Sequence, residues 1–289
     1  MFVQMKRIKL LVPLLNFINT YSICVALGSF SCYVFFSKVY KVQPNYVVAL
    51  GLALGVWFIY TLDHLLDGIQ LKYKATARRH KVHFAKQKTV APLLAAVGLL
   101  LLLLACYVPQ AYYKIVGILI ALTTAHFMIN YLVPVRFKQK FFFKEVFIAV
   151  VVAVGFCVVP LADIPFAIWP SSMPVLLKAL VFLNLTNLFV FSFFDKEADQ
   201  EAEVLSLAQL TTARTIHRLC VLSVLFSAVF TSVGLWQGEV SVMVWFVFFA
   251  MQSSLFIIVT NKRYFQLEDR YRFFGDLIYV YPLAAMPFL

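Results

Sequence analysis

Charged residues are scarce in this sequence, and acidic residues are scarcer than basic ones. Only 13% of its 289 residues are charged, whereas 63% are hydrophobic, and the mean hydropathy is +0.88. A water-soluble protein of this length cannot bury so much apolar surface. The composition therefore excludes an ordinary soluble enzyme and predicts an all-α integral membrane protein, because helices satisfy their own backbone hydrogen bonds in lipid.

Cysteine patterns that would indicate metal or redox chemistry are also missing. The sequence has five cysteines, and no two of them form a CxxC pair. All five lie within or at the edges of apolar runs, so we expect them to pack in helices rather than to form disulfides or a zinc site.

Apolar runs long enough to cross a bilayer recur along the whole chain. A spanning helix needs about 20 residues to cover a hydrocarbon core of about 30 Å. The nine predicted spans are Ile8–Phe36, Pro44–Leu66, Thr89–Pro109, Tyr112–Pro134, Phe141–Pro160, Met173–Phe194, Arg214–Trp236, Val240–Thr260 and Phe273–Leu289. The basic start of the chain resembles a secretory signal, but the apolar run that follows is too long and lacks a clear cleavage site, so a retained first span is favoured.

Lys and Arg are distributed unevenly between the two sides of the predicted bundle. With a cytoplasmic amino terminus, 21 of the 25 fall on the cytoplasmic side, and only Lys38, Lys41, Lys114 and Lys178 fall on the other. We therefore expect a multi-pass protein of the cytoplasmic (inner) membrane, with its amino terminus in the cytoplasm. The net charge of +12 follows from this topology and favours contact with anionic membrane lipids, so no nucleic-acid partner is needed to explain it.

Seven of the 13 acidic residues fall in two short segments at predicted cytoplasmic helix ends. The first segment holds Asp63 and Asp67, which are four residues apart and so share one helical face. The second holds Asp195, Asp199 and Glu203 at the same spacing. Like charges at this spacing repel each other, so we expect a cation to compensate them.

Basic loops are predicted on the same side as the acidic segments. Their residues are Lys72, Lys74, Arg78, Arg79, Arg136, Lys138, Lys140 and Lys144. Carboxylates suit Mg²⁺, which shares its remaining positions with substrate phosphates, while Arg and Lys neutralise phosphate oxygens. Acids or bases alone are more typical of solvated helix ends, but together they predict a site for Mg²⁺ and a phosphorylated substrate. Asn187 and Phe191 continue the second acidic stripe into the membrane, whereas His80 and His83 are expected to be solvated loop residues.

At these segments the chain resembles the UbiA superfamily of intramembrane prenyltransferases. The residues that fit the first family motif, NDxxDxxxD followed by K/R-x-x-A-x-x-R, are Asp63, Asp67, Lys72, Lys74, Ala75, Arg78 and Arg79. The residues that fit the second motif are Asp195, Asp199 and Glu203, followed by Ser206-Leu207-Ala208. Ile59 and Tyr60 stand where the family usually has Asn and Asp, so the chain resembles a divergent member with a depleted first motif.

The resemblance implies a single transmembrane domain over residues 1–289, with about nine helices around a central cavity open to lipid. It also implies Mg²⁺ as cofactor, an isoprenyl diphosphate as donor and an aromatic or other hydrophobic acceptor. The implied catalytic and metal-binding carboxylates are Asp63, Asp67, Asp195 and Asp199, with Glu203 as a further metal ligand. The implied substrate-binding residues are Tyr60, Lys72, Arg78, Arg79, Arg136, Lys140, Asn187 and Phe191.

Two other functions are compatible with the same residues. A terpene cyclase on the same scaffold would ionise the same diphosphate but would need no acceptor. A membrane transporter or binding protein for cations or anionic lipids would use the same charges without releasing diphosphate. Prenyl transfer is the favoured interpretation.

Overall fold

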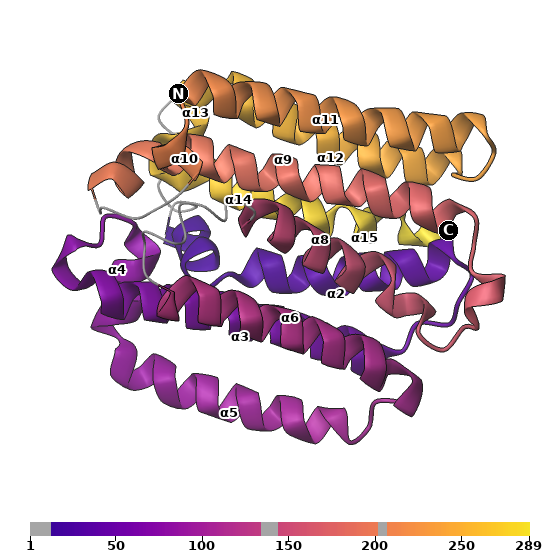
Figure 1. Cartoon of the computed structure of the whole chain (residues 1–289), viewed down its shortest axis with the longest axis horizontal. Helices are drawn as coiled ribbons and strands as arrows, with labels where there is room; N and C mark the ends of the chain where they lie inside the picture. Colours follow the sequence, from indigo (N-terminus) through magenta and orange to yellow (C-terminus); the bar gives the residue numbers. More distant parts are fainter. Residues whose placement is uncertain (1–12, 134–143, 202–206) are drawn as a thin grey trace, which may run out of the picture.

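The regular secondary structure of the described residues is all helical, and no strand occurs among them. The structure is a computed structural model that describes residues 13–133, 144–201 and 207–289. Its α-helices are Pro13–Thr20, α2 (Ile23–Val39), α3 (Tyr46–Leu71), α4 (Arg78–Ala85), α5 (Gln87–Ala105), α6 (Tyr113–Leu132), α8 (Lys144–Cys157), α9 (Ser172–Glu201), α10 (Leu207–Leu210), α11 (Ala213–Trp236), α12 (Val242–Thr260), α13 (Lys262–Phe265), α14 (Arg270–Leu277) and α15 (Pro282–Ala285). The long helices run side by side across the molecule, and α4, α10 and α13 gather at one end of the bundle (Figure 1).

Polar caps set the starts of three long helices. The side chain of Asn45 accepts hydrogen bonds from the amides of Val47 and Val48 at the start of α3, at 3.0 and 3.2 Å. Thr212 and Ser241 cap α11 and α12 in the same way. Each cap satisfies amide groups that have no partner within their own helix.

The described chain has seven helical segments that are long and apolar enough to cross a membrane. They are Tyr46–Lys74, Gln87–Ala105, Gln110–Leu132, Lys144–Leu161, Ser172–Glu201, Ala213–Trp236 and Val242–Thr260. The pair Pro13–Thr20 and Ile23–Val39 would make an eighth span, although its two helices meet at 66°. The prediction of an all-helical, multi-pass membrane protein is confirmed.

Two predicted spans differ from the observed helices. The predicted first span is bent in the described part, because the chain breaks at Tyr21 and Ser22, where Ser22 has a φ of 53°. The predicted span Phe273–Leu289 is divided into α14, α15 and short 3-10 turns, because Pro282 and Pro287 have no backbone N–H to continue a helix.

Helix α9 occupies the centre of the bundle and packs against α8, α10, α11, α12 and α14. Of its most apolar stretch, 61% is buried in protein, against 11% for α5 and none for Gln110–Leu132. Polar side chains join α9 to its neighbours: Asn184 donates to the carbonyl of Ala149 at 3.0 Å, and Ser227 donates to that of Ala179 at 2.8 Å. Interhelical hydrogen bonds of this kind commonly hold membrane helices together.

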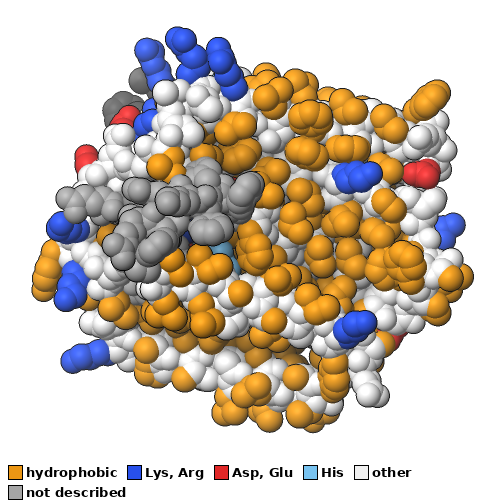
Figure 2. Space-filling model, viewed as in Figure 1, with side chains coloured by type: hydrophobic (Ala, Val, Ile, Leu, Met, Phe, Trp, Pro, Cys, Tyr) orange, Lys and Arg blue, Asp and Glu red, His pale blue; other side chains and the backbone are white. Residues whose placement is uncertain are grey.

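Apolar side chains cover much of the face drawn in Figure 2, and most of its Lys and Arg lie toward the two ends of the bundle. Many large hydrophobic side chains are exposed: Leu102 is 69%, Ile120 is 61% and Leu132 is 71% exposed. A soluble protein does not present apolar surface on this scale, so these residues are placed to meet lipid.

Candidate functional site

The two acidic segments meet at the end of the bundle where α4 lies (Figure 1). Arg79 Nη2 lies 3.8 Å from Asp195 Oδ2 on α9, and His80 Nε2, from the next residue of α4, lies 3.6 Å from Asp67 Oδ2 on α3. Thr76, just before α4, donates a hydrogen bond to the carbonyl of Ala198 at 3.1 Å. Segments 132 residues apart in the sequence are therefore brought together by adjacent residues of one short helix.

Asp63 and Asp67 converge on a tyrosine that the sequence did not single out. The hydroxyl of Tyr131, at the end of α6, lies 2.9 Å from Oδ1 of each carboxylate. The two acids therefore point at a common position, as their four-residue spacing predicts. Tyrosines near span ends are usually interfacial anchors, so nothing in the sequence distinguishes Tyr131 from them.

Asp195 is paired in a different way, with residues of α14. Its Oδ1 accepts a hydrogen bond from the hydroxyl of Tyr271, and its Oδ2 accepts one from Nη2 of Arg272. Both oxygens of this mostly buried carboxylate therefore face hydrogen-bond donors. Neither Tyr271 nor Arg272 was predicted for the site. Both belong to a basic segment that, in the sequence, indicates only which side of the membrane the loop lies on.

A further acid lies one helical turn deeper than Arg272. Asp276 lies beside the amide of Asn187 and near Tyr60 of α3. Tyr279 donates a hydrogen bond to Asn184 at 2.8 Å, which extends this polar group further along α9. A carboxylate inside an apolar bundle is a marker of function, so Asp276 joins the candidate site although the sequence did not select it.

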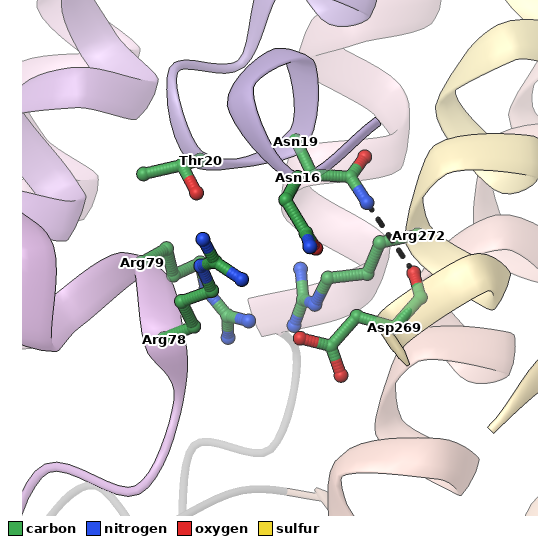
Figure 3. Close-up of a pocket in the computed structure, with 7 residues that line it drawn as sticks. All are labelled: Asn16, Asn19, Thr20, Arg78, Arg79, Asp269 and Arg272. Carbon is green, nitrogen blue, oxygen red and sulfur yellow. Dashed lines mark hydrogen bonds between the residues drawn. The ribbon is translucent and has the colours of Figure 1, made fainter. Parts of the chain in front are cut away.

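A small pocket opens among three arginines at the same end of the bundle (Figure 3). It is lined by Asn16, Asn19, Thr20, Arg78, Arg79, Asp269 and Arg272. The guanidinium groups come from α4 and α14, and the asparagines come from the first described helix. Asn19 Nδ2 donates to the carbonyl of Asp269 at 3.4 Å, which ties that helix to the start of α14. Such a cluster of guanidinium groups suits an anion with several oxygens.

Of the remaining predicted residues, some are buried at the site, some are more accessible, and some lie outside the described chain. Phe191 is buried beneath Arg272, whose guanidinium carbon lies 4.8 Å from the ring centroid. Lys72 is exposed at the end of α3, and Asp199 is half-buried one turn beyond Asp195. The predicted residues Arg136, Lys140 and Glu203 lie outside the described residues.

The prediction that His80 and His83 are solvated is wrong. His80 is 9% exposed and His83 is fully buried, because α4 folds back against α3. The close approach depends on Gly68, where a Cβ would lie 2.7 Å from the carbonyl oxygen of His80. Burial, with the charge of Arg79, lowers the pKa of His80 to about 2, so this ring is neutral at pH 7.

The protein should lose stability in mild acid partly through His83. Burial lowers the pKa of His83, and this effect outweighs the hydrogen bond between Nδ1 and the carbonyl of Arg79 at 2.8 Å. The unfolded chain takes up a proton near pH 6.5 and the folded chain does not, so stability is full above that pH and falls below it, by up to about 1.4 kcal/mol per pH unit per site. Thermal unfolding in detergent at pH 8 to 5 should show a shallower pH slope for His83→Gln, and an unchanged slope would contradict this account.

The carboxylates at this end of the bundle differ in how well they fit Mg²⁺. Among the described residues, no three His, Cys, Asp or Glu side chains are grouped as a metal site. Asp63 and Asp67 nevertheless fit a magnesium ion, because Mg²⁺ is often held by one or two carboxylates and completes its shell with water and substrate phosphate. Asp195 does not fit in the same way, since its Oδ2 faces the cationic side chains of Arg272 and Arg79. The hydroxyl of Tyr131, which contacts Asp63 and Asp67, is neutral.

Comparison of the chain with protein-family models, curated proteins and solved structures finds no match. The functional assignment therefore depends on the residues and geometry described above.

The close contact between α14 and α9 predicts a strong effect of one methyl group. A Cβ at Gly275 would lie 2.7 Å from both Asn187 Oδ1 and Phe191 Cε1. Gly275→Ala should therefore destabilise the protein by about 1–3 kcal/mol through overpacking. The matched control is Gly55→Ala in α3, where nothing lies within 4 Å of the added Cβ and the change should be neutral or stabilising. Equal thermal unfolding temperatures for the two variants would contradict the prediction.

Proposed function

We propose that the protein catalyses Mg²⁺-dependent transfer of a prenyl group from an isoprenyl diphosphate to an aromatic or other hydrophobic acceptor within the membrane, as a divergent UbiA-like prenyltransferase. The observation that supports this most is the meeting of the two acidic segments through Arg79 and His80 at one end of an apolar bundle. An isoprenyl diphosphate matches this arrangement, because its charged diphosphate suits the charged end of the bundle and its hydrocarbon tail suits the apolar helices.

In this proposal Asp63 and Asp67 hold the metal ion and Arg78, Arg79 and Arg272 bind the diphosphate. Bound Mg²⁺ neutralises charge on the phosphate oxygens and so makes diphosphate a better leaving group. The three guanidinium groups add donors aimed at the same oxygens, where negative charge grows as the bond to carbon breaks.

The reaction breaks the bond between the prenyl C1 carbon and the diphosphate oxygen, and the electron pair leaves with diphosphate. An electron pair of the acceptor then forms the new bond to C1, and the proton that the acceptor loses leaves with diphosphate. The rings of Phe191 and Tyr271 contact each other beside the charged end, and Tyr60 lies near Asp63. In this proposal these three rings flank the prenyl chain. Apolar walls exclude water, and aromatic faces stabilise the transient allylic cation.

The topology belongs to the same proposal. Nine crossings require the segment from α14 to α15 to cross the bilayer, and its contacts agree with this. Arg272, near its start, lies beside the acidic segments. The segment then packs along α2 through Ile278 and Tyr279 and reaches the opposite end, where Lys38 donates to the carbonyl of Met286 at 2.9 Å. We propose a central cavity open to lipid and a cytoplasmic charged end, as the distribution of Lys and Arg predicts.

The test is release of diphosphate by the purified protein in lipid vesicles, with Mg²⁺ and isoprenyl diphosphates of several lengths. Release that requires Mg²⁺ and is lost with EDTA supports the proposal, and the organic product then separates a transferase from a cyclase. If no diphosphate is released with any candidate acceptor, and none of the donors binds in the presence of Mg²⁺, the enzyme is excluded and a transporter or lipid-binding protein becomes the better interpretation.

A further inference from the structure

The two acidic segments differ in how their charge is compensated. Asp195 already faces two positive groups: Arg272 hydrogen-bonds Oδ2, and Arg79 Nη2 lies 3.8 Å from the same oxygen. Tyr271 donates to Oδ1, so both oxygens of the carboxylate have protein partners. The side chain of Asp195 is only 13% exposed.

Arg272 is held in place rather than free to swing aside. Its side chain is 17% exposed, and its guanidinium lies over the Phe191 ring, 4.8 Å from the centroid. The neighbouring Tyr271 stacks on Phe194 with ring centroids 4.5 Å apart and an interplanar angle of 5°. Gly275 lets α14 lie directly against Asn187 and Phe191, so the backbone that carries Arg272 is fixed as well.

The first acidic segment shows a different arrangement. Among the described residues, the polar contacts of Asp63 and Asp67 are with the neutral hydroxyl of Tyr131 and with His80. The charges of Lys144 and Arg79 also act on Asp67. Two carboxylates that converge on one neutral hydroxyl can accept a divalent cation, whereas a cation at Asp195 would stand beside two guanidinium groups that repel it.

We propose that Arg272 is the built-in cation of the second acidic segment, so that this protein takes one divalent metal ion, at Asp63 and Asp67. This inference rests on the proposed function and changes the predicted metal set, because Asp195 then serves to orient Arg272 and Arg79 toward the diphosphate instead of binding Mg²⁺. A protein-borne charge in this position is present before substrate arrives and needs no ion from solution.

The experiment counts bound Mn²⁺, as a spectroscopic substitute for Mg²⁺, by electron paramagnetic resonance on the full-length protein in lipid vesicles. Titrations are made with and without inorganic diphosphate, so no prenyl donor, acceptor or turnover is needed. The variants are Asp67→Asn, Asp195→Asn, Arg272→Gln and Arg272→Lys. Thermal unfolding of each variant shows which of them are folded.

One Mn²⁺ per wild-type chain is expected. Its dissociation constant should rise about tenfold or more in Asp67→Asn but stay within about twofold in Asp195→Asn and Arg272→Lys. Removing the internal charge in Arg272→Gln should create a second Mn²⁺ site, which the double variant with Asp195→Asn should lose again. If Arg272→Gln does not fold, the wild-type count and the Asp195→Asn titration decide the matter.

Two Mn²⁺ ions in the wild type, or loss of the single ion in folded Asp195→Asn, would overturn the role of Arg272 and leave the proposed function standing. Absence of a second site in folded Arg272→Gln would also overturn it. A wild-type protein that binds no Mn²⁺ even with diphosphate would remove the metal-dependent function itself, so the two failures are distinguishable.

Discussion

Diphosphate release is expected to fall at least about 100-fold when Asp67 is replaced by Asn, measured at saturating isoprenyl diphosphate and Mg²⁺. Asp67 shares one position with Asp63 around the Tyr131 hydroxyl, so the substitution removes half of the negative charge available to a metal ion there. The amide keeps the size of the side chain, so the effect should appear in turnover and in Mg²⁺ dependence rather than in folding.

The matched control for this variant is Glu197→Gln. Glu197 is an acid of the second segment, but its side chain is 72% exposed and its contact with Lys262 spans 3.7 Å at the surface. Exposed pairs of this kind contribute about 1 kcal/mol or less. Equal loss of turnover in the two variants would mean that general negative charge, and not the Asp63–Asp67 position, supports the reaction.

Breaking the Asp195–Arg272 pair should have the largest effect on stability. Arg272→Gln leaves buried Asp195 with the neutral hydroxyl of Tyr271 and, among the described residues, one facing cation, Arg79. The change should cost about 3–5 kcal/mol, since removal of one member of a buried pair leaves the other poorly compensated. The double variant with Asp195→Asn should recover about 1–3 kcal/mol of that loss. Unfolding in mixed micelles, followed by circular dichroism, measures both effects.

Arg270→Gln supplies the comparison from the same helix. The guanidinium of Arg270 lies 4.7 Å from the centroid of the Tyr264 ring, which is 53% exposed. Loss of a cation–π contact near the surface should cost about 0.5–1 kcal/mol. Additive effects of Asp195→Asn and Arg272→Gln, with no recovery in the double variant, would show that the two side chains are not energetically coupled.

The helical membrane fold and the meeting of the acidic segments could be predicted from the sequence. Long apolar runs determine where a chain crosses a bilayer, and polar residues at the ends of those runs must lie near a surface. Asp63 and Asp195 each end such a run, on the side that Lys and Arg indicate. Their shared location follows from topology alone, without knowledge of which helices touch.

The partners within the site could not be predicted, because they depend on how helices dock. Arg272 reaches Asp195 only because Gly275 brings α14 against α9. His80 reaches Asp67 only because α4 folds back over Gly68. In the sequence both segments look like ordinary basic loops, and the pattern carries no information on which of their side chains turns inward.

The pairing of α9 with α14 also sets an order for biosynthesis. Asp195 enters the membrane boundary 77 residues before its partner Arg272 is made. Until α14 has been made, Arg272 is absent, and Arg79 is the described cation that can face the acid. The charged end of the bundle therefore closes only after α14 has been made, and a chain that stalls between these two helices exposes an acidic group without Arg272 as its partner.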